Sequence, residues 1–401
     1  MKRQFIKKFI TTILFIIFLF TFSFLNLYKS YTPLKEAVKK TQVSSLKEYI
    51  SSIENTINEN IYGKYKFIEG YGYMQKLMGK NEISNFEVVK DTEGKLHFTY
   101  FTDKRNPTED ITRKLKDLKD GIKDSEKELI YLMTPDKYIE GHTEFPKGIP
   151  YHHNNETTDS FLRELSSYGI DSIDLREGIL ESGIKGEDLF FNTDHHWKIE
   201  TSFWGFGQVV KNLNEKYGLN LDENNFYRDI NNYNIIKYDN SFIGSMGRKT
   251  GKYYTEGDDF SLIYPKFKTD YDFYFENSFT KGTLTGRFEE ALIAMNPIRK
   301  YDVYGIVADK YFSYLYGNQP FAHIKNKENK DGLKVLFIKD SLAVPLISFF
   351  SSVCSDVYLI DPRYYKEDIL KFINDTELDF VFVSYSPQNL VEEFFEFRKK
   401  N

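Results

Sequence analysis

Two short segments hold the residue types that hydrolytic and acyl-transfer enzymes use. In the first, Asn192-Thr-Asp-His-His-Trp197, the residues Asp194 and His196 lie two positions apart, so their side chains share a face where the chain is extended. A carboxylate fixes the tautomer of a neighbouring histidine and stabilises its protonated form, which suits the histidine to act as a general base. The alternative is that Thr193 or Asp194 only caps the helix that follows, and that the two histidines are incidental.

The second segment ends in a serine. The apolar run 335–338 is typical of a buried strand, and Lys339, Asp340 and Ser341 follow it directly, before a helical pattern. A serine at such a junction exposes its hydroxyl as a nucleophile, and nearby backbone N–H groups stabilise an oxyanion. Alternatively, Asp340 or Ser341 is only a helix N-cap. Together the two segments offer Asp, His and Ser, and triads occur in any chain order.

The elements that would position these residues follow a repeating pattern from about residue 126 onward, where short apolar runs alternate with helical stretches. The predicted strands cover 129–134, 172–175, 335–338, 356–360 and 380–384, and the predicted helices cover 158–167, 200–217, 342–353 and 366–373. Such alternation indicates βαβ units around a parallel sheet, so we expect an α/β domain over 126–401. In these sheets functional residues gather at the carboxyl ends of the strands.

Two regions depart from this rhythm. Residues 31–125 predict an amphipathic stalk helix over 30–60, a hairpin over 86–100 and a capped lead-in helix over 106–124. Residues 221–330 are rich in Tyr, Asn, Asp and Gly, which indicates a β- and loop-rich insertion or cap within the α/β domain.

The N-terminus predicts a membrane anchor. Four basic residues precede an uncharged apolar run, 9–28, which as a helix is about 30 Å long and matches a bilayer core. No small-residue cleavage site follows, so we expect residues 1–30 to be an uncleaved cytoplasmic tip and transmembrane helix. The positive-inside rule then places the rest of the chain outside the cytoplasm, as a single-pass protein of the cell membrane.

Composition narrows the function classes. The formal net charge of -5 gives no basic face for phosphate contacts, so we expect no nucleic-acid binding. Cys354 is the only cysteine, which excludes an intrachain disulfide and a cysteine-rich metal site. His152 and His153 have no spacing to Asp194 or His195 that enforces a metal site, and we expect no metal and no cofactor.

The run Asp194-His195-His196-Trp197, with Lys339-Asp340-Ser341 at a later strand end, resembles the DHHW family. That family is similar to the SGNH-hydrolase-like domains of alginate-type polysaccharide O-acetyltransferases. The resemblance extends from about residue 60 onward. Three further segments support it more weakly, namely Thr134-Pro-Asp-Lys137, Phe242-Ile-Gly-Ser-Met-Gly247 and Ile360-Asp-Pro-Arg363. It implies a flavodoxin-like sheet that is circularly permuted, since the Asp/His pair here precedes the Ser.

The resemblance also implies roles for individual residues. Ser341 would be the nucleophile, His196 the general base and Asp194 the orienting acid, while His195 would point away from Ser341. Lys339 stands where the usual Gly-Asp-Ser has its glycine, which bears on the tight turn there. The candidates for substrate binding or an oxyanion hole are Gly244, Ser245, Asn318 and Arg363.

The function expected on this basis is an extracytoplasmic O-acyltransferase that acetylates a cell-surface polysaccharide through an acyl-Ser intermediate. The resemblance implies a membrane-bound O-acyltransferase as a partner that supplies the acyl group. One alternative is a carbohydrate esterase with the same triad, because the two activities differ only in whether water or a sugar reaches the acyl-enzyme. A second alternative is a non-catalytic glycan-binding envelope protein.

Overall fold

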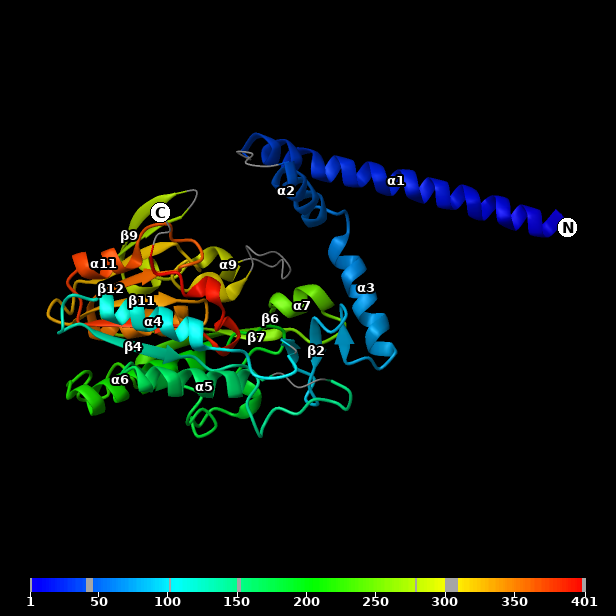
Figure 1. The fold of residues 1–401 in the computed structure, drawn as a ribbon. Coiled ribbons are helices and arrows are strands. Elements are labelled where there is room, and N and C mark those ends of the chain that lie inside the picture. The colour runs from blue at the N-terminus through cyan, green and yellow to red at the C-terminus, as the bar shows by residue number, and fades with distance from the viewer. Residues whose placement is uncertain are drawn as a thin grey trace. The chain divides into compact units, whose positions relative to one another are not determined.

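The computed structural model describes residues 2–40, 46–100, 102–149, 153–277, 280–299 and 309–398. The chain divides into two compact units, Met1–Met74 and Gln75–Asn401 (Figure 1). The first contains the candidate membrane helix, and the second contains the α/β domain.

The N-terminal unit is helical, with α1 (Lys2–Lys40), α2 (Leu46–Glu59) and most of α3 (Lys64–Leu77). Among the described residues α1 is the only helix that is long and apolar enough to cross a membrane. The predicted single helix over 30–60 is wrong, because α1 continues to Lys40 and a separate helix starts at Leu46. The backbone N–H of Tyr62 donates to Oδ1 of Asn26 at 2.8 Å, which ties the chain after α2 to α1.

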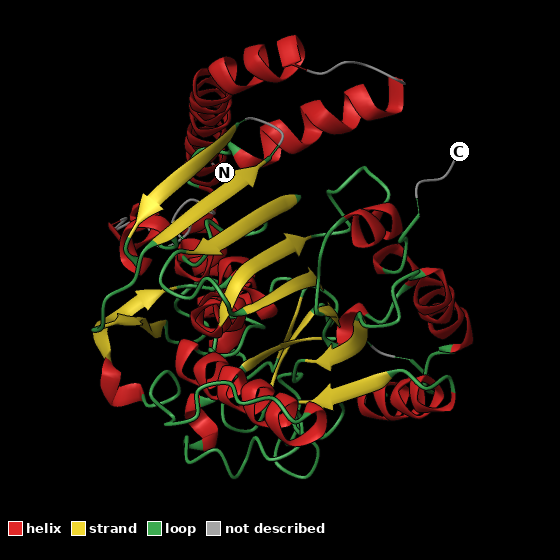
Figure 2. Cartoon of the chain, turned by 90° about the vertical axis from the view of Figure 1, so that its left-hand side faces the viewer, coloured by secondary structure: helices red, strands yellow, loops and turns green. Residues whose placement is uncertain are grey.

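An eight-stranded sheet runs through the second unit in the order β5-β4-β13-β11-β12-β10-β8-β9. Figure 2 shows strands of this unit with helices packed around them. The five predicted strands are all present and pair in parallel. Their bounds are β4 (Glu128–Met133), β5 (Asp171–Asp174), β11 (Leu333–Lys339), β12 (Cys354–Ile360) and β13 (Phe380–Ser384).

The order of the parallel strands confirms the circular permutation. Counted in chain order with β11 as the first strand, and returning to β4 after β13, the sheet order is 2-1-3-4-5, which is that of flavodoxin-like sheets. In this order the topological switch point lies between β11 and β13. Ser341 follows the carboxyl end of β11, so it lies at the crevice where such sheets bind ligands.

The insertion contributes to the sheet, which the sequence did not indicate. Its strands β8 (Tyr271–Glu276), β9 (Lys281–Gly286) and β10 (Phe321–Asn326) extend the sheet beyond β12 with antiparallel pairing. The sheet is therefore mixed, and β10 satisfies the hydrogen-bonding groups at an edge of β12 that would otherwise be open. The insertion also contains β6 (Tyr233–Phe242) and β7 (Asp258–Pro265), which pair antiparallel in a separate two-stranded sheet.

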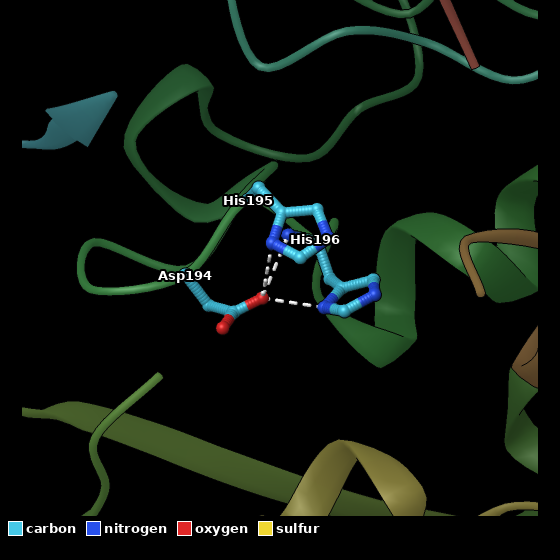
Figure 3. A group of neighbouring side chains, drawn as sticks. All are labelled: Asp194, His195 and His196. Carbon is cyan, nitrogen blue, oxygen red and sulfur yellow. Dashed lines mark hydrogen bonds and ion pairs between the residues drawn. The ribbon is translucent and has the colours of Figure 1, made fainter. Parts of the chain in front are cut away.

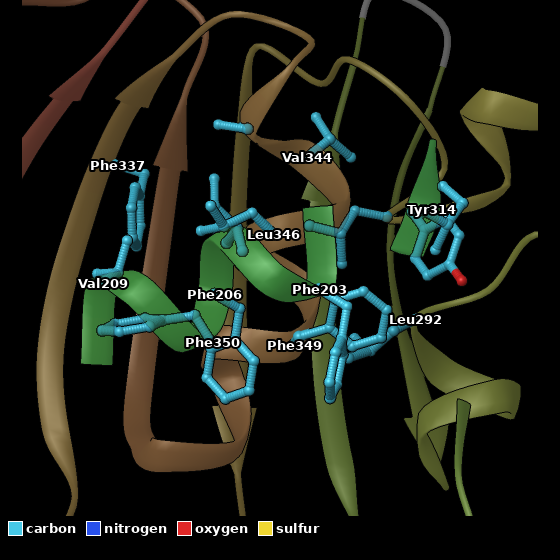
Figure 4. Packing of buried hydrophobic residues seen from close by; sticks show 14 of the residues in the cluster. Phe203, Phe206, Val209, Leu292, Tyr314, Phe337, Val344, Leu346, Phe349 and Phe350 are labelled. Carbon is cyan, nitrogen blue, oxygen red and sulfur yellow. The ribbon is translucent and has the colours of Figure 1, made fainter. Parts of the chain in front are cut away.

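Helices cover both faces of the sheet. One buried cluster joins α6 (Ile199–Tyr217) and α10 (Ala343–Phe350) to the sheet, and Figure 4 shows their phenylalanines interleaved beside Phe337 of β11. A second cluster joins α4 (Glu109–Gly121), α5 (Asn154–Ser167) and α11 (Ile369–Asp375) to the sheet. The helix after β11 and the helix after β12 thus pack in different clusters, as a switch point requires.

The remaining elements are small. A three-stranded sheet contains β1 (Glu82–Ile83), β2 (Val88–Lys90) and β3 (Leu96–Phe98), and its antiparallel β2–β3 pair confirms the predicted hairpin. The short helices are α7 (Ser245–Thr250), α8 (Phe288–Ala291) and α9 (Met295–Arg299).

The packing between α6 and α10 predicts a large effect of one truncation. Phe206 is 0% exposed and its ring contacts Phe203 and Phe350. We expect Phe206→Ala to lower the free energy of unfolding by about 3–5 kcal/mol, because it removes buried surface and leaves a cavity. Urea unfolding of the full chain in detergent, followed by circular dichroism, measures this.

The matched control is Leu180→Ala, since Leu180 is a large apolar residue that is 46% exposed. We expect this control to change the unfolding free energy by no more than about 0.5 kcal/mol. Equal losses in the two variants would contradict the packing described here.

Candidate active site

The segment with Asp194 and His196 forms a tight loop before α6. The loop closes where Phe190 bridges Trp197 and where the N–H of Phe191 donates to the carbonyl of His196 at 3.2 Å. Two buried charges from other elements hold its backbone. The Asp258 carboxylate accepts from the N–H of Thr193 at 2.8 Å, and Lys137 Nζ donates to the carbonyl of Asp194 at 3.0 Å.

Both of these charged groups are removed from water. Burial raises the pKa of Asp258, although hydrogen bonds from Thr193 and Asn192 oppose that change. Burial lowers the pKa of Lys137 to about 8, which leaves it largely protonated at neutral pH. The backbone of this loop is therefore hydrogen-bonded both to the buried Asp258 carboxyl group and to the buried Lys137 amino group.

Asp340 shapes the turn that presents Ser341. Its carboxylate accepts from the N–H of Leu342 at 2.9 Å, but the N-cap of α10 is Leu342 and has no side-chain cap, so the alternative of Asp340 or Ser341 as the helix N-cap is wrong. The same carboxylate accepts from the N–H of Ser386 and from Nδ2 of Asn389, each at 2.8 Å. The turn after β11 is thereby tied to the segment after β13, and Ser341 remains partly exposed.

The structure brings Ser341, His196 and Asp194 together. His196 Nε2 lies 2.8 Å from Ser341 Oγ, and its Nδ1 is hydrogen-bonded to Asp194 Oδ1. Figure 3 shows the Asp194 carboxylate oxygen that faces the two histidine rings. Tyr311 stacks on the His196 ring with centroids 3.8 Å apart, and its hydroxyl donates to the carbonyl of Leu342 at 3.0 Å.

The Asp194 carboxylate is 1% exposed. Burial alone would raise its pKa, but the charges of His196 and His195 and hydrogen bonds from His196 and Ser245 hold the pKa well below its usual value. Asp309 lies close enough for burial and the Asp194 charge to raise its pKa to about 6, while Arg248 pairs with it at 3.0 Å. As the pH falls, Asp194 therefore keeps its charge to a lower pH than Asp309 does.

Gly244 and Ser245 have a different role from the expected oxyanion hole. The N–H of Gly244 donates to Oγ1 of Thr193 at 2.8 Å, and the N–H of Ser245 donates to Oδ2 of Asp194 at 2.5 Å. Both donors are thus already used to fix the Asp194 loop. A Cβ on Gly244 would lie 2.2 Å from Asp194 Cβ, so the position needs glycine for close approach.

His195 directs its hydrogen bond to Ser245. Its Nδ1 lies 3.2 Å from Ser245 Oγ and 3.4 Å from Asp194 Oδ1. Burial and the neighbouring His196 lower the pKa of His195 to about 3, so the ring is neutral. The possible ligand atoms of Asp194, His195 and His196 lie within 4.8 Å of one another, and Asp194 and His196 are hydrogen-bonded to each other.

The Lys339 side chain does not crowd the turn before Ser341, although the usual Gly-Asp-Ser motif has glycine at this position. Its side chain is 1% exposed and extends into a buried network, where Nζ donates to Asn318 Oδ1 at 2.8 Å and lies 3.6 Å from Asp361 Oδ2. Arg363 binds the same Asp361 carboxylate through two nitrogens, at 2.9 and 2.7 Å. Arg363 therefore pairs with Asp361, and Asn318 is held by Lys339.

Sequence reasoning missed several residues of the site. Lys137 had a weak signal, because the run from Thr134 to Lys137 follows a strand, but Asp258, Asp309 and Tyr311 had none. Each of these side chains reaches the site from a distant part of the chain, and only the tertiary structure shows it.

Comparisons with known proteins agree with this fold. Residues 96–230 match the family model of the SGNH hydrolase-like domain of the acetyltransferase AlgX. PatB1 of Bacillus cereus, solved with a sulfonyl adduct, is 20% identical with a TM-score of 0.63, and the alignment covers 79% of this chain and 99% of PatB1. A DHHW family protein from Eubacterium siraeum is 17% identical with a TM-score of 0.58, over 78% and 96% of the two chains. No curated protein matches the sequence.

The close approach at Gly244 predicts that Gly244→Ala disturbs Asp194 and with it the His196–Ser341 pair. We expect the reaction of Ser341 with a sulfonyl fluoride to slow by roughly 100-fold or more, the lower range of what a positioned general base contributes. Intact-mass spectrometry of the full chain over time measures the rate. Gly282→Ala is the control, because no atom lies within 4 Å of a Cβ built there, and an equal rate in the two variants would contradict the prediction.

The Lys339 network predicts a cost in stability. Lys339→Met keeps the length of the side chain but leaves Asn318 Oδ1 without its donor, which costs about 1–3 kcal/mol for a buried acceptor. Urea unfolding measures the loss. The control is Lys268→Met, since the Lys268 side chain is 80% exposed and surface ion pairs contribute little. A Lys339→Met variant as stable as the wild type would contradict this account of the network.

Proposed function

We propose that this chain is a membrane-anchored, extracytoplasmic O-acyltransferase that acetylates a cell-surface polysaccharide through an acyl-Ser341 intermediate. One observation carries the proposal. Ser341 Oγ, His196 and the buried Asp194 carboxylate form a continuous hydrogen-bonded chain, with 2.8 Å between Oγ and Nε2. The match of residues 96–230 to the domain of an acetyltransferase supports the acyl class of the reaction.

In the first half-reaction Ser341 Oγ attacks the carbonyl carbon of an acyl ester, and His196 Nε2 takes the hydroxyl proton. The tetrahedral intermediate then collapses. The bond from the carbon to the leaving oxygen breaks, and that oxygen takes the proton from His196. The role of Asp194 is to stabilise the imidazolium between these two steps, for which its ionised state is suited.

In the second half-reaction a sugar hydroxyl gives its proton to His196 while its oxygen attacks the acyl-Ser carbon. The bond to Ser341 Oγ breaks, and Oγ recovers the proton. Water in place of the sugar makes the same enzyme an esterase, and the partly exposed Ser341 gives this second candidate a physical basis.

The oxyanion that forms in each half-reaction needs donors that are still free. In the part of the chain that the structure describes, the N–H of Ser341 donates no hydrogen bond. The side-chain oxygen of Asn318 accepts a hydrogen bond from Lys339. The Nδ2 group of the same Asn318 amide is therefore directed toward other acceptors. We assign these two donors to the oxyanion in place of Gly244 and Ser245.

The location is part of the proposal. The apolar segment of α1 follows four basic residues, so the positive-inside rule favours an α/β domain outside the cytoplasm. An acyl donor must then be delivered across the membrane. We propose that a membrane-bound O-acyltransferase partner performs this delivery.

The test uses the full chain in detergent with a chromogenic acetyl ester and intact-mass spectrometry. We expect the wild type to gain the mass of one acetyl group and to turn over, and we expect Ser341→Ala and His196→Ala each to lose roughly 1,000-fold or more in turnover. Ser167→Ala is the control, since Ser167 is an exposed residue at the end of α5.

Added oligosaccharide then separates the activities. Acetyl transfer to the sugar identifies the transferase, and release of acetate alone identifies the esterase. A folded wild type that neither forms the adduct nor turns over, and behaves like Ser341→Ala, would overturn the catalytic proposal in favour of a glycan-binding protein.

A further inference from the structure

The outer face of α6 carries an unusual set of residues. Its inner face, with Phe203, Phe206 and Val209, packs in the buried cluster of Figure 4. The outer stripe, at helical spacing, reads Trp204, Gly207/Gln208 and Lys211. Trp204, one of the chain's two tryptophans, is half-buried and packs against the edge of the same cluster, while Lys211 is exposed.

This stripe forms one wall of an open groove of about 540 Å³. The opposite wall comes from the segment after α6, and its residues include Asn225, Arg228 and Asp229. A Cβ on Gly207 would have Arg228 Cδ at 3.9 Å, an ordinary contact distance, so the two walls approach each other at this position. The groove is therefore lined by an aromatic wall and a polar wall.

The polar wall is fixed in advance. Arg228 Nε donates to Asp222 Oδ2 at 3.0 Å, and its Nη2 donates to the carbonyl of Asp222 at 3.2 Å. The Asp222 side chain is itself 2% exposed. A ligand would thus meet this wall without the entropy cost of ordering a free arginine.

Three groups on α6 are polar, half-buried and unused. Over the described residues, the indole N–H of Trp204, the side-chain amide of Gln208 and the carboxylate of Glu200 make no hydrogen bond within the chain. A half-buried indole normally finds a partner for its N–H. These groups offer donors and acceptors beside an apolar ring, as sites that orient small ligands do.

We propose that this groove is a glycan-binding site separate from the triad. The apolar face of a pyranose ring would stack on the Trp204 indole, and its hydroxyl groups would bind Gln208 and Glu200. A sugar suits these groups because it combines an apolar C–H face with a rim of hydroxyls. The inference depends on the proposed function only for the polysaccharide as the molecule to be bound, since binding here needs no acyl transfer.

The site is placed to serve the reaction. α6 begins at Ile199, three residues after His196, so the loop that holds His196 leads directly into the helix that lines the groove. A polysaccharide held along the outer face of α6 is thereby kept near the end of the helix at which Ser341 lies.

The experiment uses the two tryptophans as reporters in the full chain in detergent. Trp197 is 0% exposed, and Trp204 lines the groove. The probes are the tetramers of β-1,4-linked N-acetylglucosamine and of β-1,4-linked glucose, with free glucose as background. We expect a tetramer to shift the tryptophan emission to shorter wavelength with saturation, and we expect Trp204→Phe, which retains Trp197, to abolish the shift.

Affinity by calorimetry gives the second readout. We expect Trp204→Ala and Gln208→Ala each to weaken tetramer binding by roughly tenfold or more, the factor for a lost contact of about 1.4 kcal/mol. Tyr168→Ala is the control, because Tyr168 is a 42%-exposed aromatic residue at the end of α5, and its affinity should equal that of the wild type.

The Ser341→Ala variant separates this inference from the proposed function. Binding that survives in Ser341→Ala and is lost in Trp204→Ala supports the groove, whether or not the wild type transfers acetyl groups. Binding that is unchanged in Trp204→Ala, or no response to either tetramer, would overturn it.

Discussion

The buried carboxylate of Asp194 is the constraint on which the rest of the site depends. An ionised group that is almost fully shielded from water is costly unless hydrogen bonds and opposite charges surround it. Here His196 binds one oxygen through its ring and its backbone N–H, and Ser245 binds the other through its N–H. The hydrogen bonds that compensate the charge of the carboxylate are thus the same ones that fix the orientation of the His196 imidazole.

The same constraint explains why distant residues converge there. Gly244 has no side chain because its backbone must reach the Asp194 loop, and Lys137 binds the carbonyl groups of that loop from the segment after β4. Asp309 and Arg248 form a second charged pair nearby. The strands of the parallel sheet provide the rigid base for these contacts, because the segments after β4, β11 and β13 all emerge at the carboxyl ends of the strands.

Local patterns in the sequence were sufficient for the parallel strands, the helices between them and the Asp–His–Ser set. A buried strand or an amphipathic helix is encoded by residues that are close in sequence. The pairing of β10 with β12 was not accessible in this way, because it joins alternating segments whose partners the sequence leaves open. The occupied N–H groups of Gly244 and Ser245 could not be predicted either, since a glycine-flanked serine gives the same pattern whether its amides face a substrate or a carboxylate. The change from α1 to α2 also escaped prediction, because the apolar spacing continues across it.

Competition with water is the physical problem that a transferase with this site has to solve. Ser341 is partly exposed, and water is far more concentrated than any polysaccharide hydroxyl. Transfer therefore depends on the effective concentration of the sugar at the acyl-enzyme, which attachment at a second point raises without any new contact at the reacting atoms. The glycan site proposed on α6 and the membrane anchor proposed at the N-terminus would act in the same direction, since one would hold the acceptor and the other would keep the chain where surface polymers and a membrane-bound acyl donor meet. On this view the chemistry common to an esterase and a transferase lies in the triad, and the choice between them lies in the surfaces that surround it.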